Sequence, residues 1–170
     1  MDYRPERSFL PLSLVVALAL PGNAAAQLPV GFATPEEALV VTLRGEGVQI
    51  YECKAGGDGK LIWTLREPKA TLRLKGKTVG RYYAGPNWEH IDGSGVAANV
   101  VANALGKTPN DIPWLKLKAT SHRGRGTFSG VTTVLQINTQ GGVHSGPCDK
   151  AGDLYNAPYA ADYVFLQQGG

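Results

Sequence analysis

The segment Leu115–Ala119, with the sequence Leu-Lys-Leu-Lys-Ala, decides the fold class, because apolar and basic side chains alternate strictly along it. A period of two is typical of a β-strand that has one face on a core and the other in solvent. The segments at 71–75 and 131–138 repeat this alternation. We therefore predict half-buried strands at all three places, and in the last one we expect Leu135 to face the core and Gln136 to face solvent.

Short apolar runs elsewhere in the chain are separated by turn-forming residues. The 170 residues include 22 glycines and 11 prolines, a share well above the roughly 12% of average proteins. Clusters such as Arg44-Gly45-Glu46-Gly47 and the segment Ala55–Gly59 predict tight turns. Further strands are predicted at Val40–Leu43, Val48–Cys53, Leu61–Leu65, Val79–Tyr83 and Ala160–Leu166. Many short strands predict an all-β, single-domain antiparallel β-sandwich or flattened barrel.

Three segments depart from this pattern. Thr34-Pro35-Glu36-Glu37 has the features of a capping box, with proline at the first helical position, and predicts a single helical turn before the first strand. Val96–Leu105 combines alanines that favour a helix with valines that suit a strand, and we expect a strand. Gln140–Asn156 is rich in Gly, Asp and Asn and predicts a long surface loop.

The N-terminal segment has the features of an export signal. Two arginines precede an apolar run from Phe9 to Leu20, and a small-residue stretch ends at Ala26. We therefore predict that residues 1–26 are a secretory signal peptide and that 27–170 form one β domain. The apolar run is shorter than the about 20 residues that a membrane span needs. We expect a mature chain without a membrane span, located in a periplasm or outside the cell.

Both cysteines lie after the predicted cleavage point. An oxidising compartment favours pairing them, so we predict a disulfide between Cys53 and Cys148. Neither cysteine has a second ligand at a recognised metal spacing, and His90, His122 and His144 lie in separate segments, so no metal site is predicted. The net charge of +3 is unchanged without the signal segment, which holds two acidic and two basic residues. A bias this small gives no reason to expect nucleic acid as a partner, and no cofactor is predicted.

Several long motifs are spread over the predicted domain. They are Gly47–Cys53, Val79–Glu89, Asp92–Ser94, Ile112–Ala119, Gly126–Val131 and Pro158–Phe165. Through them the chain resembles, over about residues 40–167, the bacterial and fungal family called domain of unknown function 3455. The resemblance implies an exported single-domain protein and transfers no catalytic residue, because no established activity comes with the family name. It also leads us to expect a histidine where this chain has Tyr82.

The most unusual stretch is Arg81–Ser94, where aromatic, basic and acidic side chains gather in a turn-rich segment. The proposed ligand-binding residues are Arg81, Tyr82, Trp88, Glu89, His90 and Asp92. Aromatic rings stack on the apolar faces of sugars, and carboxylates and amides bind sugar hydroxyls, so carbohydrate is the candidate ligand. The alternative is structural: Tyr83 and Trp88 would lie in the core, and Asp92-Gly93-Ser94 would form a turn.

Three functions stay open. The first is a non-catalytic binding module for a cell-surface or extracellular ligand, which we favour because binding needs only exposed groups. The second is a small exported hydrolase or lyase that uses Glu89, His90 and Asp92. The third is a structural or envelope-stress protein without a small-molecule ligand.

Two other features of the sequence bear on its function. The basic segment Ser121–Gly126 could face an anionic ligand, although a hairpin loop with solvated charges is the simpler account. Asp162 shares the parity of apolar residues in the last strand, and a buried carboxylate needs a partner. We expect an ion pair between Asp162 and an arginine, with Arg81 as the candidate.

Overall fold

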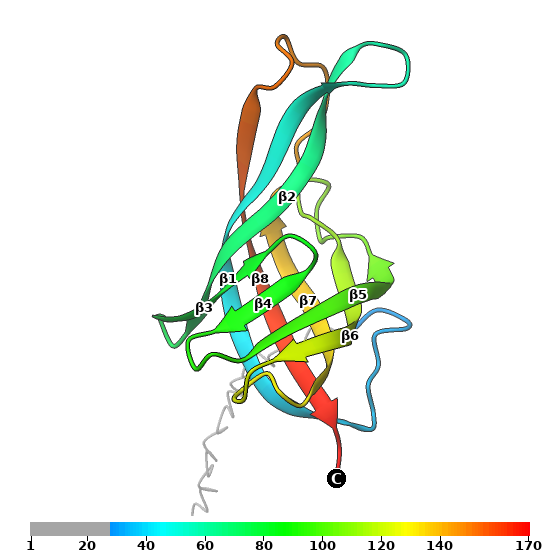
Figure 1. The fold of residues 1–170 in the computed structure, drawn as a ribbon. Helices are drawn as coiled ribbons and strands as arrows, with labels where there is room; N and C mark the ends of the chain where they lie inside the picture. Colours follow the sequence, from blue (N-terminus) through cyan, green and yellow to red (C-terminus); the bar gives the residue numbers. More distant parts are fainter. Residues whose placement is uncertain (1–27) are drawn as a thin grey trace, which may run out of the picture.

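The computed structural model describes residues 28–170, so the predicted signal peptide at 1–26 lies outside the described residues. Eight antiparallel strands form one sheet that closes into a barrel in sequence order, with β8 pairing back onto β1 (Figure 1). The predicted all-β antiparallel fold is confirmed, and of its two forms the chain adopts the barrel. The strands are β1 (Glu37–Ala55), β2 (Leu61–Leu74), β3 (Lys77–Tyr83), β4 (Asn87–His90), β5 (Gly95–Ala104), β6 (Trp114–Arg123), β7 (Val131–Gly141) and β8 (Leu154–Gln168).

Aromatic rings fill the inside of the barrel. Trp88 is 1% exposed, and its ring stacks on Tyr82 with 5.0 Å between the ring centroids. Phe128, from the β6–β7 loop, stacks on Phe165 of β8 at 4.3 Å, and both rings are fully buried. Tyr163 packs against the first pair, 5.1 Å from the ring of Tyr82 and 5.8 Å from that of Trp88, and Trp88 contacts Phe165 at 6.0 Å. Burying such large apolar rings is the main source of stability that this core offers.

The predicted turn at Arg44-Gly45-Glu46-Gly47 is wrong, because these residues lie in the middle of β1. The two glycines serve close packing instead of a turn. A Cβ atom on Gly45 would clash with the ring of Tyr163, and one on Gly47 would clash with the backbone carbonyl of Lys69. Only glycine lets neighbouring groups approach the backbone this closely. The two strands predicted on either side of the segment are therefore one strand.

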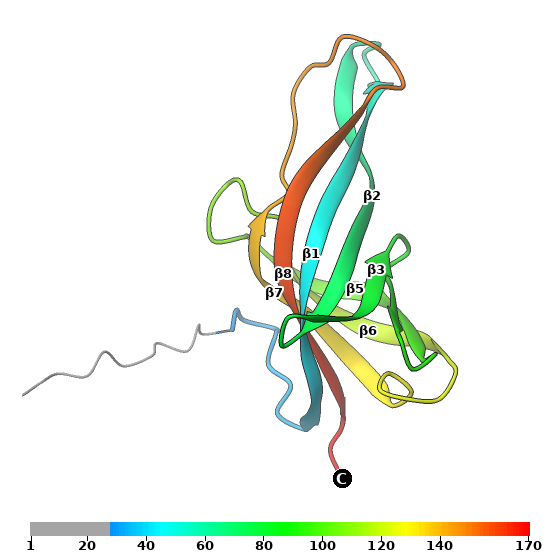
Figure 2. The same cartoon turned by 90° about the vertical axis from the view of Figure 1, so that its left-hand side faces the viewer.

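Beyond the barrel, parts of three strands continue as a long projection (Figure 2). We call it the arm, and it comprises residues 48–55 of β1, 61–68 of β2 and 154–158 of β8. Residues 142–153 form a loop that returns along the arm, whereas both ends of the predicted loop at Gln140–Asn156 belong to β7 and β8. The loop is held by the predicted disulfide between Cys53 and Cys148, whose Cα atoms are 5.9 Å apart.

The loop and the arm share a small core of their own. The ring of His144 stacks on Tyr155 with 3.8 Å between centroids, and it also contacts Trp63 and Tyr51 at 5.4 and 5.6 Å. The hydroxyl of Tyr51 donates a hydrogen bond to the carbonyl of Gly142 at 3.0 Å. The loop is therefore held to the arm by aromatic packing as well as by the disulfide.

The outside of β7 carries a second apolar cluster. Val131 lies in the barrel core as predicted, but beyond the register shift that follows it the predicted faces of the strand are reversed. Leu135 pairs with Val164 on the outer side, where buried Phe32 from the N-terminal segment covers it beside half-buried Trp114. Gln136 is 4% exposed, and its amide donates to the carbonyl of Pro113 at 2.9 Å. Leu135 therefore packs outside the barrel, while Gln136 is buried and satisfied by a hydrogen bond.

The two uncertain segments are also settled by the structure. Residues 96–104 belong to strand β5, as expected. The helical turn predicted at 34–37 is wrong: the backbone N–H of Glu37 donates to the carbonyl of Thr34 at 3.1 Å in a simple turn, and Glu37 already begins β1. Its carboxylate does not cap a helix but accepts hydrogen bonds from the hydroxyls of Thr132 and Thr133 at 2.7 and 2.6 Å.

Residues 28–170 contain no helix that is long and apolar enough to cross a membrane.

Removing the disulfide should lower the free energy of unfolding without changing the fold of the barrel. The bond joins residues separated by 95 positions, and the loop-closure model gives up to about 4 to 5 kcal/mol for such a link. We expect the Cys53→Ser/Cys148→Ser variant to have a clearly lower urea midpoint and to keep its far-ultraviolet circular dichroism. Wild-type protein treated with reductant should match the variant. An unchanged midpoint in both samples would contradict the stabilising role.

Candidate functional site

The outer wall of β3 to β6 carries a row of side chains that strand register brings together. Arg81 of β3 is opposite Glu89 of β4. Glu89 is opposite Gly95 of β5, and Gly95 is opposite Arg123 of β6. Directly paired residues of antiparallel strands project from the same face of the sheet. The register thus gathers charged groups from three strands on one patch of the outer surface.

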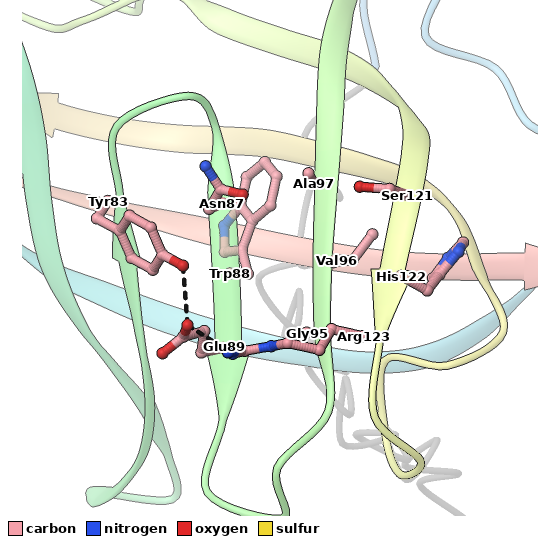
Figure 3. A pocket seen from close by; sticks show the side chains of 10 residues that line it. All are labelled: Tyr83, Asn87, Trp88, Glu89, Gly95, Val96, Ala97, Ser121, His122 and Arg123. Atoms are coloured by element: carbon pink, nitrogen blue, oxygen red, sulfur yellow. Dashed lines mark hydrogen bonds and ion pairs between the residues drawn. The ribbon is translucent and has the colours of Figure 1, made fainter.

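Glu89 is the centre of this patch. Its Oε2 accepts a hydrogen bond from Nε of Arg81 at 2.5 Å, and its Oε1 accepts one from Nη2 of Arg123, also at 2.5 Å. The hydroxyl of Tyr83 donates to Oε1 at 2.8 Å. Figure 3 shows Tyr83 and Arg123 directed toward the Glu89 carboxylate from opposite sides. Two guanidinium groups and one carboxylate leave the group with a net positive charge.

These contacts set the protonation of the patch. The hydrogen bond from Tyr83, followed by the contacts with Arg81 and Arg123, lowers the pKa of Glu89 despite some desolvation. The same hydrogen bond to Glu89 raises the pKa of the Tyr83 hydroxyl. Glu89 is therefore held ionised as an acceptor, and Tyr83 is held protonated as a donor.

A shallow hollow of about 220 Å³, which we call the first hollow, opens beside the patch. Asn87 and Ser121 line it together with Tyr83, Glu89 and Arg123 (Figure 3). Its lining therefore combines an amide, two hydroxyls, a carboxylate and a guanidinium group, which together can donate and accept hydrogen bonds.

The Arg123 side chain passes over Gly95 at ordinary contact distance. A Cβ atom there would lie 3.5 Å from Nη2 of Arg123 and 3.2 Å from the carbonyl oxygen of Trp88. The Arg123 side chain thus lies directly over the backbone of β5 on its way to Glu89.

Asp92, by contrast, is occupied by structural contacts. Its Oδ1 accepts from the backbone and hydroxyl of Ser94 at 2.9 and 2.6 Å, and its Oδ2 accepts from the backbone and hydroxyl of Thr127 at 2.8 and 2.7 Å. The Nδ1 atom of His90 lies 2.9 Å from Oδ2. Desolvation opposes ionisation of Asp92, but the hydrogen bonds from Ser94 and Thr127 outweigh it and hold the pKa well below its usual range. Asp92 clamps the β4–β5 turn to the β6–β7 loop.

The six residues proposed from the sequence are thus divided between three places. Arg81 and Glu89 lie together on the outer wall. His90 and Asp92 lie at the β4–β5 turn, where the ring of His90 packs edge-on against Phe128 at 5.5 Å. Tyr82 and Trp88 are inside the barrel, at 5% and 1% exposure. Their rings are stacked on each other and do not form a shelf at the surface.

Sequence reasoning left Tyr83 and Arg123 out of the site. Alternation counted from the exposed Arg81 would have placed Tyr83 on the outer wall and Tyr82 inside. For Arg123 the sequence signal is weaker: its basic segment is a candidate for binding an anionic ligand, but only the pairing of β5 with β6 brings Arg123 to Glu89.

Asp162 forms the predicted ion pair with an arginine, but the partner is Arg44 and not Arg81. Asp162 is opposite Arg44 of β1, whose Nη1 donates to its Oδ1 at 3.1 Å. Both side chains are on the outer face and are about one-third exposed. Arg81 is instead paired with Glu89. Asp162 therefore avoids the cost of burial by facing outward beside a neighbouring strand's arginine.

Comparison with known proteins gives a family and no closer neighbour. A family model described as "Protein of unknown function (DUF3455)" matches residues 34–167, nearly all of the described chain. No curated protein and no solved structure matches the chain. Within residues 28–170, no group of three or more His, Cys, Asp or Glu side chains is arranged to hold a metal ion.

Replacing Asp92 by asparagine should weaken the clamp and change the acid response. The amide has one acceptor oxygen where the carboxylate uses two, so we expect a loss of about 1 to 2 kcal/mol at neutral pH. The ordinary pKa of 3.8 is lowered in the folded state, so the Asp92 contribution is complete above about pH 4 and is lost as the pH falls further. Urea midpoints should show a wild-type-to-variant gap that is present at pH 4 and above and narrows as the pH falls below about 4.

Asp149→Asn serves as the control for this measurement, because Asp149 is exposed in the loop beside Cys148. Its gap to wild type should be small at every pH. A gap for Asp92→Asn that widens as the pH falls below about 4 would contradict the assignment.

Proposed function

The chain belongs to the DUF3455 family of proteins of unknown function, and we propose that it is an exported, non-catalytic binding module that recognises an acidic saccharide at the cell surface or outside the cell. One observation carries the proposal. Two arginines converge on a single carboxylate at the edge of a hollow that also presents amide and hydroxyl groups.

The charge of the patch favours an acidic group on the ligand. Arg81 and Arg123 are largely exposed, and each uses only part of its guanidinium group on Glu89. A planar guanidinium group matches a carboxylate with paired hydrogen bonds. Glu89 balances only one of the two positive charges of Arg81 and Arg123. A ligand carboxylate that binds Arg123 would therefore neutralise the remaining positive charge.

The other side chains of the first hollow suit a sugar. Asn87 and Ser121 can exchange hydrogen bonds with hydroxyl groups, and half-buried Tyr83 adds part of its ring. Few well-placed polar groups beside an aromatic ring are typical of small-ligand sites. Export is supported by the disulfide, which suits an oxidising compartment, and by the predicted signal peptide.

A binding role fits these residues better than hydrolysis does. A glycoside hydrolase of the common type needs one carboxyl group kept protonated as the acid. The pKa values of Glu89 and Asp92 are both lowered, and Asp92 is occupied by the loop clamp. The patch thus holds its carboxylates as fixed acceptors, which supports recognition of a ligand without its conversion.

The proposal is tested by titration calorimetry with a glucuronate-containing disaccharide and with its neutral glucose counterpart. We expect heat of binding for the acidic sugar only, and a weaker affinity as the salt concentration rises. Arg123→Ala should weaken binding about tenfold or more, since a charge-assisted hydrogen bond is worth about 1.5 kcal/mol or more.

Arg125→Ala is the matched control, because it removes the same charge from an exposed position two residues away. It should bind like wild type. Equal binding of the neutral sugar, or an equal loss in both arginine variants, would reject recognition of an acidic group at this patch. Absence of binding by any sugar would favour a structural role.

A further inference from the structure

A second and larger hollow lies on the other side of Tyr83. It measures about 650 Å³ and is formed where β1 and β2 pass from the barrel into the arm, next to the end of β3. Tyr83 lines both hollows, and Arg81, which contacts Glu89, lines the second as well. Figure 2 shows the arm continuing beyond β3.

We propose that the two hollows are one continuous binding surface for an extended acidic oligosaccharide chain that lies across strands β1 to β6. The inference rests on the proposed function, because it places the acid-binding patch at the middle of this surface. It adds the length and the direction of the ligand.

Strand register supplies the path. The outward residues paired across six neighbouring strands form a row: Val48, Lys69, Tyr83, Asn87, Ala97 and Ser121. Neighbouring strands are about 4.8 Å apart, so the row extends for roughly 24 Å along the wall. A single sugar ring covers only a fraction of this distance, whereas a chain of several rings can contact all of it.

The side chains along the row change from apolar at the β1 end to polar at the β6 end, and a sugar chain can contact both kinds. At the β1 end, half-buried Val48, Ile50 and Pro68 give the second hollow an apolar lining that suits the faces of sugar rings. At the β6 end, Asn87 and Ser121 offer polar groups to hydroxyls. Tyr83 lies between these ends, with the guanidinium carbon of Arg81 5.5 Å from its ring centroid.

The charges of the second hollow also favour an acidic chain. Its two carboxylates already have partners, since Glu46 is 2.9 Å from Nε of Arg73 and Glu67 is 3.6 Å from Nε of Arg66. Lys69 is exposed and makes no ion pair with the residues that the structure describes. Lys69 can therefore meet a second acidic group, at a distance from the one held by Arg123.

The test compares glucuronate-containing oligosaccharides from disaccharide to hexasaccharide by calorimetry. We expect the hexasaccharide to bind the wild-type protein at least tenfold more tightly than the disaccharide. Lys69→Ala should weaken hexasaccharide binding severalfold and leave disaccharide binding unchanged. Arg123→Ala should weaken both ligands. Lys77→Ala, which removes the same charge from the start of β3, is the control and should change neither.

Nuclear magnetic resonance gives a second readout that does not depend on the variants. The methyl signals of Val48 and Ile50 should shift with the hexasaccharide and not with the disaccharide. If both lengths bind equally and Lys69→Ala has no effect, the ligand is confined to the first hollow, and the extended surface is rejected while the proposed function stands. If no acidic sugar of any length binds, the proposed function fails and the extended surface fails with it.

Discussion

The pairing of β1 with β8 closes the barrel and so separates the side chains that face its interior from those that face outward. The pairing runs from Glu37 to Glu52 along β1 and needs its backbone to pass close to a buried aromatic ring. Gly45 makes this possible, because the ring of Tyr163 occupies the space where a side chain would be. Once the sheet is closed, alternation leaves Tyr82 inside and Tyr83 outside. Because Tyr82 fills the interior, its neighbour Tyr83 faces the outer wall and becomes part of the patch around Glu89.

Much of the fold could be predicted from the sequence, because a period of two appears wherever one face of a strand is wet. The alternation around Leu117, which is 1% exposed, is sufficient to predict a strand and its buried face. It failed where both faces are covered: Leu135 packs under Phe32, and Gln136 is buried with a hydrogen bond. A short glycine-rich segment can form either a turn or a closely packed strand. At Gly45 only the contact with the ring of Tyr163 distinguishes close packing from a turn.

The candidate site could be predicted only in part, because most of it depends on register. Arg81 and Glu89 are eight residues apart and share a hairpin, so local sequence brings them together. Arg123 is 34 residues beyond Glu89, and no local sequence pattern predicts their contact. Trp88 looked like a binding residue because of its type. Its place in the stack with Tyr82 follows from parity along β4, which is too short to reveal a period by itself.

The three tryptophans occupy three separate environments. Trp63 belongs to the aromatic group of the arm, Trp88 to the barrel interior and Trp114 to the outer cluster under Phe32. Each indole is thus an intrinsic fluorophore for a different region. Chains that retain one indole at a time would reveal whether arm, interior and outer cluster melt as a single cooperative unit or in succession, without any added dye.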